Sequence, residues 1–276
     1  MRALWVIGVL VGCSQPPAEP STPAEPTPPA LPPHRQLADA AALVTHIGAQ
    51  GPRVLGVGEL HQVVEGPQGP AAIDWFTDQL LPLLAPSTTD LVIETWVFEG
   101  SCGAQEEVVV EVLPEATNRP VETEDAIVRL ARIARELGVT PHALELSCDD
   151  YDAVVGPDDE IVYDQLLAVM TRELGKLATQ GLETPDATVI LYGGAVHNDL
   201  HPRPALATYS YATALALLPG GEAYMELDLY PPAMAAAQTG FADEAWFPLI
   251  ERAGPDHLVV YERDPSSLVV LLPTGD

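Results

Sequence analysis

Two short runs of sequence read alike and decide the fold: VLGVGELH at residues 54–61 and VILYGGAVH at residues 189–197. Each begins with an apolar stretch typical of a strand buried on both faces, and each ends in Gly-x-x-His. The glycines predict a sharp backbone turn where each strand stops, because glycine tolerates conformations closed to other residues. The histidine then follows the carboxyl end of a strand, the edge at which open α/β sheets bind ligands. We therefore expect the two endings to meet in space.

Strand-like and helix-like segments alternate along most of the chain. Strands are predicted at 53–59, 90–97, 140–147 and 187–193, and helices at 71–84, 105–113, 123–137 and 158–181, with an earlier helix beginning soon after residue 36. The segment 148–157, with three Asp residues and Gly156, is predicted to be a loop. This alternation is typical of a mainly parallel sheet covered by helices on both faces. The predicted fold class is therefore α/β, with three αβα layers.

After His197 the pattern changes. Strands are predicted at 212–218, 223–230, 258–263 and 268–272, with one helix near 242–252. The turn-forming residues 264–267 predict a hairpin between the last two strands. We expect these C-terminal segments to extend the sheet with antiparallel strands.

The composition limits both architecture and partners. With 276 residues, 47% of them hydrophobic, the chain can bury one substantial core, so residues 36–276 are predicted to form a single domain. Asp and Glu number 40 against 12 Lys and Arg, a formal net charge of −28. This charge repels nucleic acid and anionic lipid, and we exclude both as partners. Because the carboxylates are dispersed along the chain, we interpret the charge as a solvated surface.

The first residues read as an export signal. Arg2 precedes an apolar stretch, residues 3–11, that is too short to span a bilayer as a mature helix but suits the core of a signal peptide at residues 1–12. The stretch ends in LVGC, which resembles a bacterial lipobox, whose cysteine receives lipid and becomes the new N-terminus. That cysteine is Cys13. An ordinary secretory signal with a chance cysteine is the alternative.

Residues 13–35 are predicted to be the lipidated cysteine and a tether. Residues 14–34 hold nine prolines among Ser, Thr, Ala and Glu, a composition that favours extended chain without a core. The predicted protein is therefore exported and lipid-anchored to the bacterial cell envelope. It contacts the membrane through that anchor only.

Two cysteines remain in the predicted domain. Cys102 and Cys148 each lie just beyond the end of a predicted strand, the second and the third. An exported compartment permits disulfides, so the two sulfurs can pair if these strands are neighbours. Two free thiols are the alternative.

Ionisable side chains gather at the predicted strand ends. Glu59 and His61 follow the first strand, Glu94 ends the second, and His197 follows the fourth. A carboxylate in an apolar strand is costly to bury without a partner, so Glu94 is the most informative acid of the chain. Two imidazoles with one or two carboxylates suit a divalent metal, or one acid can serve as base for a bound water. A structural ion pair between Glu94 and an arginine of a covering helix is the alternative without function.

These residues resemble a family. Gly58-Glu59-Leu60-His61, then Glu94, then Gly194-Ala195-Val196-His197 are similar to the successive motifs of the superfamily that joins the haem-uptake ChaN-like lipoproteins, the erythromycin esterases and the Tiki/TraB proteins. The resemblance covers roughly residues 50–200, and the Gly-Glu-x-His form is most similar to the ChaN-like branch. Glu59, His61, Glu94 and His197 then become the proposed catalytic and metal-binding residues.

The resemblance implies different activities for different branches. Tiki-like proteins are metal-dependent peptidases, esterase-like members hydrolyse a lactone with a histidine and glutamates, and ChaN-like members bind haem. This chain departs from ChaN-like sequences after His61, because residues 62–69 contain no second histidine. His61 and His197 are the residues to which a cofactor would bind. A divalent metal, namely zinc, manganese or iron, is the cofactor expected, with haem as the other possibility.

The predicted function is metal-assisted hydrolysis of a peptide, ester or lactone bond in a small-molecule or peptide substrate. The alternative is a haem- or iron-binding uptake lipoprotein without turnover, and a degenerate scaffold is a third reading. No Gly-x-Ser-x-Gly elbow occurs in the sequence, so nucleophilic serine chemistry has no local support. His201 is expected to be exposed because Pro202 argues for a loop, and His142 is expected at the edge away from the site.

Overall fold

The computed structural model describes residues 30–62, 66, 70–109, 122–184, 187–217 and 224–275. The predicted signal peptide, Cys13 and most of the predicted tether lie outside the described residues. Residues Leu31–Asp276 form one compact unit. Among the residues described, none of the helices combines the length and the apolar character that crossing a membrane requires.

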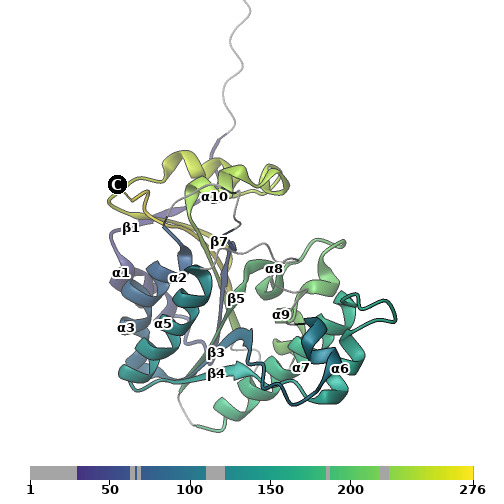
Figure 1. Cartoon of the computed structure of the whole chain (residues 1–276). Coiled ribbons are helices and arrows are strands. Elements are labelled where there is room, and N and C mark those ends of the chain that lie inside the picture. The colour runs from purple at the N-terminus through teal and green to yellow at the C-terminus, as the bar shows by residue number, and fades with distance from the viewer. Residues whose placement is uncertain are drawn as a thin grey trace, which may run out of the picture. The chain divides into compact units, whose positions relative to one another are not determined.

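The unit is built on one mixed sheet, whose order in the described chain is β1-β7-β8-β6-β2-β5-β3-β4 (Figure 1). The strands are β1 (Arg35–Leu37), β2 (Val54–Glu59), β3 (Thr88–Trp96), β4 (Thr140–Leu144), β5 (Thr188–Gly194), β6 (Tyr224–Tyr230), β7 (Leu258–Asp264) and β8 (Ser267–Leu271). Strand β2 is central and pairs in parallel with both β5 and β6. The two motif strands are therefore direct neighbours.

The predicted α/β fold is confirmed. Strands β4, β3, β5, β2, β6 and β8 run parallel, whereas β7 pairs antiparallel with β8 and β1. The predicted hairpin connects β7 to β8. The C-terminal strands β6 and β8 continue the parallel pairing, and β7 and β1 supply the antiparallel extension.

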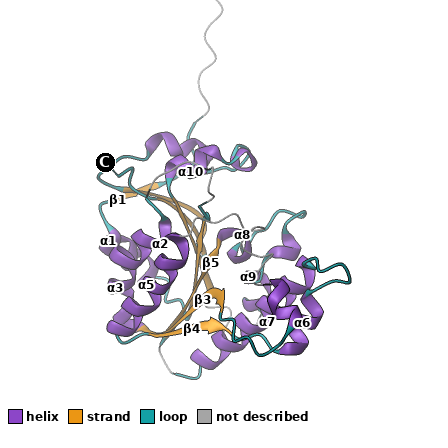
Figure 2. Cartoon of the chain, in the orientation of Figure 1, coloured by secondary structure: helices purple, strands orange, loops and turns teal. Residues whose placement is uncertain are grey.

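Helices cover both faces of the sheet (Figure 2). One face carries α1 (Ala40–Gly48), α2 (Ala72–Trp75), η1 (Phe76–Leu80), α3 (Leu81–Leu84), η2 (Ala85–Ser87) and α5 (Glu122–Glu136). The other carries α6 (Cys148–Val154), α7 (Tyr163–Gly181), α8 (Ala195–Asn198) and α9 (Ala212–Leu215). The remaining helical segments are η3 (Ala207–Tyr209), α10 (Pro232–Ala237), η5 (Thr239–Phe241) and η6 (Phe247–Arg252).

Each face of the sheet has its own apolar core. Leu43, Phe76 and Leu130 are fully buried between the sheet and the α1, α3 and α5 side. Tyr151 and Leu174 are buried on the α6 and α7 side. Burying side chains of this size stabilises the fold by about 1.5–3 kcal/mol each. The sheet is thus held between two packed layers, and its strand ends form a rigid base for the site.

The predicted helix at 71–84 is one helical segment with a wider turn inside it. Its middle, Phe76–Leu80, is π-helical. Pro82 follows in the next turn, and a proline inside a helix has no N–H and clashes with the carbonyl four residues earlier. A local π-turn is one way in which a helix accommodates such a defect.

The prediction of a loop at 148–157 is wrong for Cys148–Val154, which form α6, whereas residues 155–157 lie outside the helix. The Ser147 side chain accepts from the Asp150 N–H, and the Asp150 side chain accepts from the Ser147 N–H, a reciprocal cap. The acidic residues that suggested a loop are the first turn of a helix, where the helix dipole favours them. Helix α7 starts later than predicted, since Asp159 has a left-handed φ of 56° inside a turn that precedes it.

Two C-terminal predictions also need correction. Residues 212–218 were expected to be a strand, but Ala212–Leu215 is helical. Alanines in this segment have high helix propensity, and Tyr211 and Leu215 lie on one buried helical face, which overrides the apolar run. The helix expected near 242–252 is reduced to the 3-10 segment Phe247–Arg252, with Pro248 in its first turn. Residues 104–109 are helical, and the rest of the helix expected at 105–113 lies outside the described residues.

Candidate functional site

The register of the sheet brings the two Gly-x-x-His endings together. Val54 pairs with Val189, and five residues later Glu59 pairs with Gly194. Both strands therefore stop at the same edge, and His61 and His197 follow them there. A methyl group placed on Gly194 would lie 2.8 Å from His61 Nε2 and 3.1 Å from His197 Cδ2. The two imidazoles thus converge on one glycine.

The glycines of the motifs also allow close packing. Among the described glycines, those with a left-handed φ do not include Gly58, Gly193 or Gly194, so the chain passes from β5 into α8 at Gly194 without a left-handed residue. A Cβ on Gly58 would lie 2.5 Å from Asp228 Oδ1 and 2.7 Å from the Ala195 Cα. A Cβ on Gly193 would overlap the Glu94 carboxylate. The glycines therefore make room for polar side chains against the sheet.

Glu59, at the end of β2, is buried and uses both carboxylate oxygens. Its Oε1 lies 3.1 Å from His61 Nδ1, and its Oε2 accepts a hydrogen bond of 2.5 Å from the Tyr192 hydroxyl. A carboxylate only accepts, so we assign the proton to Nδ1 of His61. His61 Nε2 then carries a lone pair, and it is buried without a hydrogen-bond partner among the described residues.

His197, in α8, has the same tautomer for a different reason. Its Nδ1 donates to the Tyr209 carbonyl at 2.7 Å, which leaves Nε2 as the free nitrogen. That Nε2 lies 3.7 Å from Glu94 Oε1. The other oxygen of Glu94 accepts from the Gly194 N–H at 3.0 Å. Glu94 is therefore oriented by the backbone of one motif strand and directed toward the histidine that follows it.

All four predicted site residues lie at this edge, in two histidine–carboxylate pairs. His61, paired with Glu59, presents its Nε2 toward Gly194, whereas His197 presents Cδ2 toward Gly194 and its Nε2 toward Glu94. Among the described residues, no group of three or more His, Cys, Asp or Glu side chains is placed so that it could hold a metal ion. Chemically, two such nitrogens can bind a cation or accept a proton.

A second group of buried acids lies on β6, and sequence reasoning missed it. Glu226 and Asp228 are almost fully buried, and Arg263 of β7 contacts both, at 2.8 Å from Glu226 Oε1 and 3.7 Å from Asp228 Oδ2. Burial raises the pKa of Asp228 well above its ordinary value, the Glu226 charge raises it further, and Arg263 opposes both. The sequence did hold a signal that could have identified Glu226 and Asp228: each is an acid within an apolar strand, the same pattern by which Glu94 was selected.

Two tyrosines at the site were also missed. The Tyr192 hydroxyl donates to Glu59. Tyr211 is 2% exposed and stacks against the His197 ring, with centroids 6.3 Å apart. Both residues lie in apolar stretches, where a sequence pattern does not distinguish a packing ring from a hydrogen-bond donor.

The other histidines lie away from the site. His201 is exposed and contacts Asp264 at 2.6 Å, and His142 pairs with Asp90 at 2.7 Å on β3 and β4. Asn198 is fully buried, donates to the Gly56 carbonyl and accepts from the Tyr224 hydroxyl. It fixes α8 to β2 beside His197.

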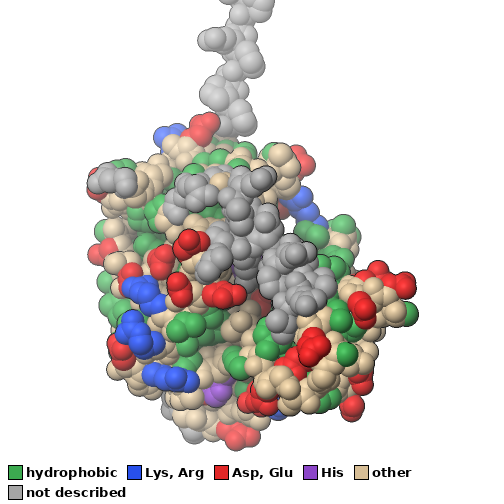
Figure 3. Space-filling model, in the orientation of Figure 1, with side chains coloured by type: hydrophobic (Ala, Val, Ile, Leu, Met, Phe, Trp, Pro, Cys, Tyr) green, Lys and Arg blue, Asp and Glu red, His purple; other side chains and the backbone are tan. Residues whose placement is uncertain are grey.

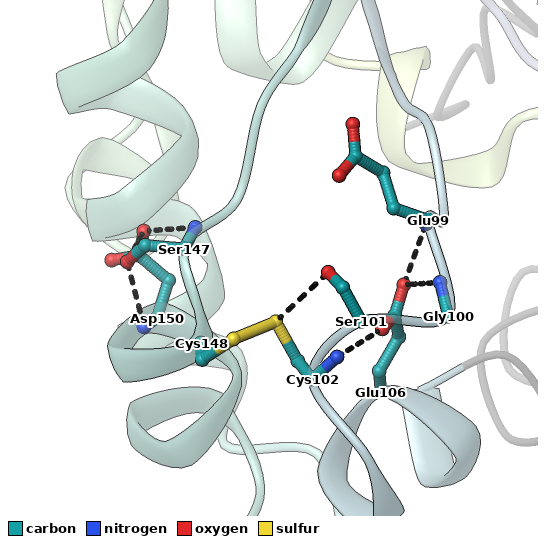
Figure 4. The surroundings of a disulfide bond; sticks show 8 residues. All are labelled: Glu99, Gly100, Ser101, Cys102, Glu106, Ser147, Cys148 and Asp150. Carbon is teal, nitrogen blue, oxygen red and sulfur yellow. Dashed lines mark hydrogen bonds between the residues drawn. A yellow bond between two sulfur atoms is a disulfide. The ribbon is translucent and has the colours of Figure 1, made fainter.

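Cys102 and Cys148 form a disulfide that fastens the chain after β3 to the start of α6 (Figure 4). Next to it, the Glu106 carboxylate accepts from the backbone N–H groups of Glu99, Gly100 and Cys102. These hydrogen bonds lower the pKa of Glu106, that from Cys102 most. The segment that leaves the Glu94 strand is thereby fixed at both ends.

Acidic side chains are spread over the face seen in Figure 3, with Lys and Arg side chains fewer among them. This agrees with the excess of Asp and Glu in the composition. The charge is distributed over several elements, as expected of a solvated surface.

Comparisons with known proteins assign no family. No protein-family model matches the chain, and no curated protein matches it. Among solved structures, the chain is similar to the type III effector HopBA1, with a TM-score of 0.44 and 14% identity, covering 88% of this chain and 98% of that one. A likeness at this level carries no inference, so the site is interpreted from its own geometry.

Proposed function

We propose that this chain is a metal-assisted hydrolase of the ChaN/Tiki/erythromycin esterase superfamily, with its site at the carboxyl edge of β2 and β5. The observation that carries the proposal is the Nε2 of His61, which is buried, has no hydrogen-bond partner among the described residues and lies beside the His197 ring at Gly194. A buried imidazole nitrogen without a partner costs free energy, and a bound cation removes that cost.

The donor chemistry fits a divalent metal. In many metal sites the ligating histidine donates its other ring N–H to a carboxylate or a backbone carbonyl, which fixes the tautomer. His61 does so to Glu59, and His197 does so to Tyr209. We propose His61, His197 and Glu94 as the ligands, a set suited to zinc, manganese or iron, with side-chain adjustment bringing the three together.

In this proposal Glu59 orients and does not ligate. Its two oxygens are engaged by His61 and Tyr192, so it holds the imidazole in one rotation and strengthens it as a donor. When bound, the metal would polarise the carbonyl of a peptide, ester or lactone and acidify a water. The chain itself supplies rigid strand ends, two fixed tautomers and a backbone N–H that orients Glu94.

A parallel titration tests the proposal. Purified metal-free domain is titrated with zinc, manganese and ferrous iron by calorimetry, and with haemin by absorbance, using wild type, His61→Ala and His197→Ala. His142→Ala is the matched control, since it removes a histidine–carboxylate pair, that with Asp90, outside the site. We expect about one metal per chain in wild type and control, and loss of binding in both site variants.

Hydrolysis is then measured on a panel of peptides, aryl esters and lactones. Metal-dependent turnover that disappears in both site variants supports the hydrolase. A saturable Soret shift that depends on either histidine, without metal-dependent turnover, would replace the hydrolase with haem binding. If the wild type binds neither metal nor haemin, the paired histidines are structural and the proposal is wrong.

We also propose that the domain is exported and lipid-anchored through Cys13. The support is the LVGC sequence at residues 10–13, together with a disulfide in the domain, since disulfides persist in oxidising compartments. Expressed in a bacterium that processes lipoproteins, the full chain should partition into detergent, and Cys13→Ser should abolish this. An unlipidated mature N-terminus found by intact mass would contradict the anchor.

A further inference from the structure

We propose that Tyr211 is a positioning residue of the candidate metal site, where it fixes His197 and Glu94 together. The inference rests on the proposed metal site and adds a residue that neither the sequence motifs nor the comparisons assign. It follows from two contacts of Tyr211 with His197 and from the position of the Tyr211 hydroxyl.

The first two contacts are with His197. The Tyr211 backbone N–H donates to the His197 carbonyl at 2.8 Å. The two rings are nearly parallel, with an interplanar angle of 19° and centroids 6.3 Å apart. Tyr211 immediately precedes α9 and is buried in the core shared with α7, so this ring is a fixed surface behind the imidazole.

The third observation concerns the hydroxyl. Tyr211 Oη is buried, makes no short hydrogen bond to a described residue, and lies near the Glu94 carboxylate. The phenol thus presents its donor in the neighbourhood of that carboxylate. A buried donor that lacks a close partner is costly, which favours a hydrogen bond to Glu94.

The other half of the site shows what such a donor does. Tyr192 donates to Glu59, and Glu59 holds His61. Tyr211, Glu94 and His197 repeat the same order of phenol, carboxylate and imidazole, but here the phenol makes no short hydrogen bond to a described residue. We assign the Tyr211 hydroxyl as the donor to Glu94 when the carboxylate binds metal, because ligating carboxylates are themselves hydrogen-bonded.

The test uses Tyr211→Phe, which keeps the stacked ring and removes only the hydroxyl. Tyr151→Phe is the matched control, because Tyr151 is a tyrosine equally buried in the same core but located in α6. Zinc affinity is measured by calorimetry on all three proteins, and the visible absorption of the cobalt-substituted proteins reports the ligand field. Thermal melting of the metal-free proteins reports stability.

We expect Tyr211→Phe to bind zinc roughly 10-fold more weakly than wild type, the size of effect seen when such outer partners are removed. Its cobalt spectrum should shift, and its melting temperature should match that of Tyr151→Phe. If wild type binds zinc and Tyr211→Phe equals Tyr151→Phe in affinity and spectrum, Tyr211 is only a packing residue and this inference alone fails. If wild type binds no zinc, the proposed function and this inference both fail.

Discussion

Glu94 on β3 and Asp228 on β6 are buried acids on the same face of one sheet, yet their surroundings differ. Gly58 pairs with Asp228 on one side and with Gly193 on the other, and the Glu94 side chain packs against Gly193. The two carboxyl groups thus approach each other across a pair of glycines. Both satisfy the rule that an acid in an apolar strand needs a partner.

The two acids, Glu94 and Asp228, differ in the groups that contact them. Arg263 pairs with the acids on β6, where burial and the neighbouring Glu226 charge raise the pKa of Asp228 and Arg263 opposes that rise. Glu94 has a backbone N–H and a histidine as partners instead, and no arginine or lysine contacts it among the described residues. A buried acid alone does not mark a site; its partner decides between structure and function.

Removing Arg263, the partner of the acids on β6, should have the largest effect on stability. Arg263→Met leaves Glu226 and Asp228 without their cation, and breaking a buried pair in this way costs about 3–5 kcal/mol of the free energy of unfolding. Urea denaturation measures the loss. Arg132→Met is the control, because Arg132 pairs with Glu136 on an exposed helix surface, where about 0.5 kcal/mol or less is expected. Equal losses in the two variants would mean that the β6 cluster is not a buried ion network.

Filling the space at Gly58, between the acids of β6 and β3, should have an intermediate effect on stability. Gly58→Ala places a methyl group 2.5 Å from Asp228 Oδ1 and 2.7 Å from the Ala195 backbone, and overpacking of this kind costs about 1–3 kcal/mol. Gly48→Ala is the control, since a Cβ there meets nothing within 4 Å. We expect the control to be neutral or stabilised by up to about 1 kcal/mol. Similar melting temperatures for both variants would contradict the close packing of α8 on β2.

The smallest effect should appear in the pH dependence of stability. Folding raises the pKa of Asp228, so the stability linked to its proton is present below the unfolded value of about 3.9 and is lost as pH rises through the folded value. Asp228→Asn cannot ionise and should therefore lose less stability than wild type between pH 4 and neutral pH. The exposed Asp256→Asn serves as the control. An identical pH slope in wild type and Asp228→Asn would show that Asp228 is already ionised in the folded protein.

Much of the fold could be predicted because strands buried on both faces leave long apolar runs. The runs at 54–59 and 189–194 specified parallel neighbours, and their shared ending specified the edge at which His61 and His197 meet. The segment at 148–157 was missed because a reciprocal cap turned an Asp-rich stretch into a helix.

The sequence predicted the four ionisable residues of the site but not the hydrogen-bond partners that set their roles. Glu59 was grouped with the ligands, since the sequence cannot show that Tyr192 and His61 use both of its oxygens. Asp228 was overlooked although it has the same sequence signal as Glu94. What distinguishes them is Arg263, a partner that only the pairing of β6, β8 and β7 brings within reach.

The most direct test compares the same chemical change at the two acids. Glu94→Gln and Asp228→Asn each replace a buried carboxyl with an amide of nearly equal size, and zinc affinity is measured by calorimetry on both and on wild type. We predict that Glu94→Gln binds zinc at least about 10-fold more weakly, whereas Asp228→Asn stays within about twofold of wild type. Unchanged affinity in Glu94→Gln, or an equal loss in Asp228→Asn, would contradict the assignment of Glu94 to the site.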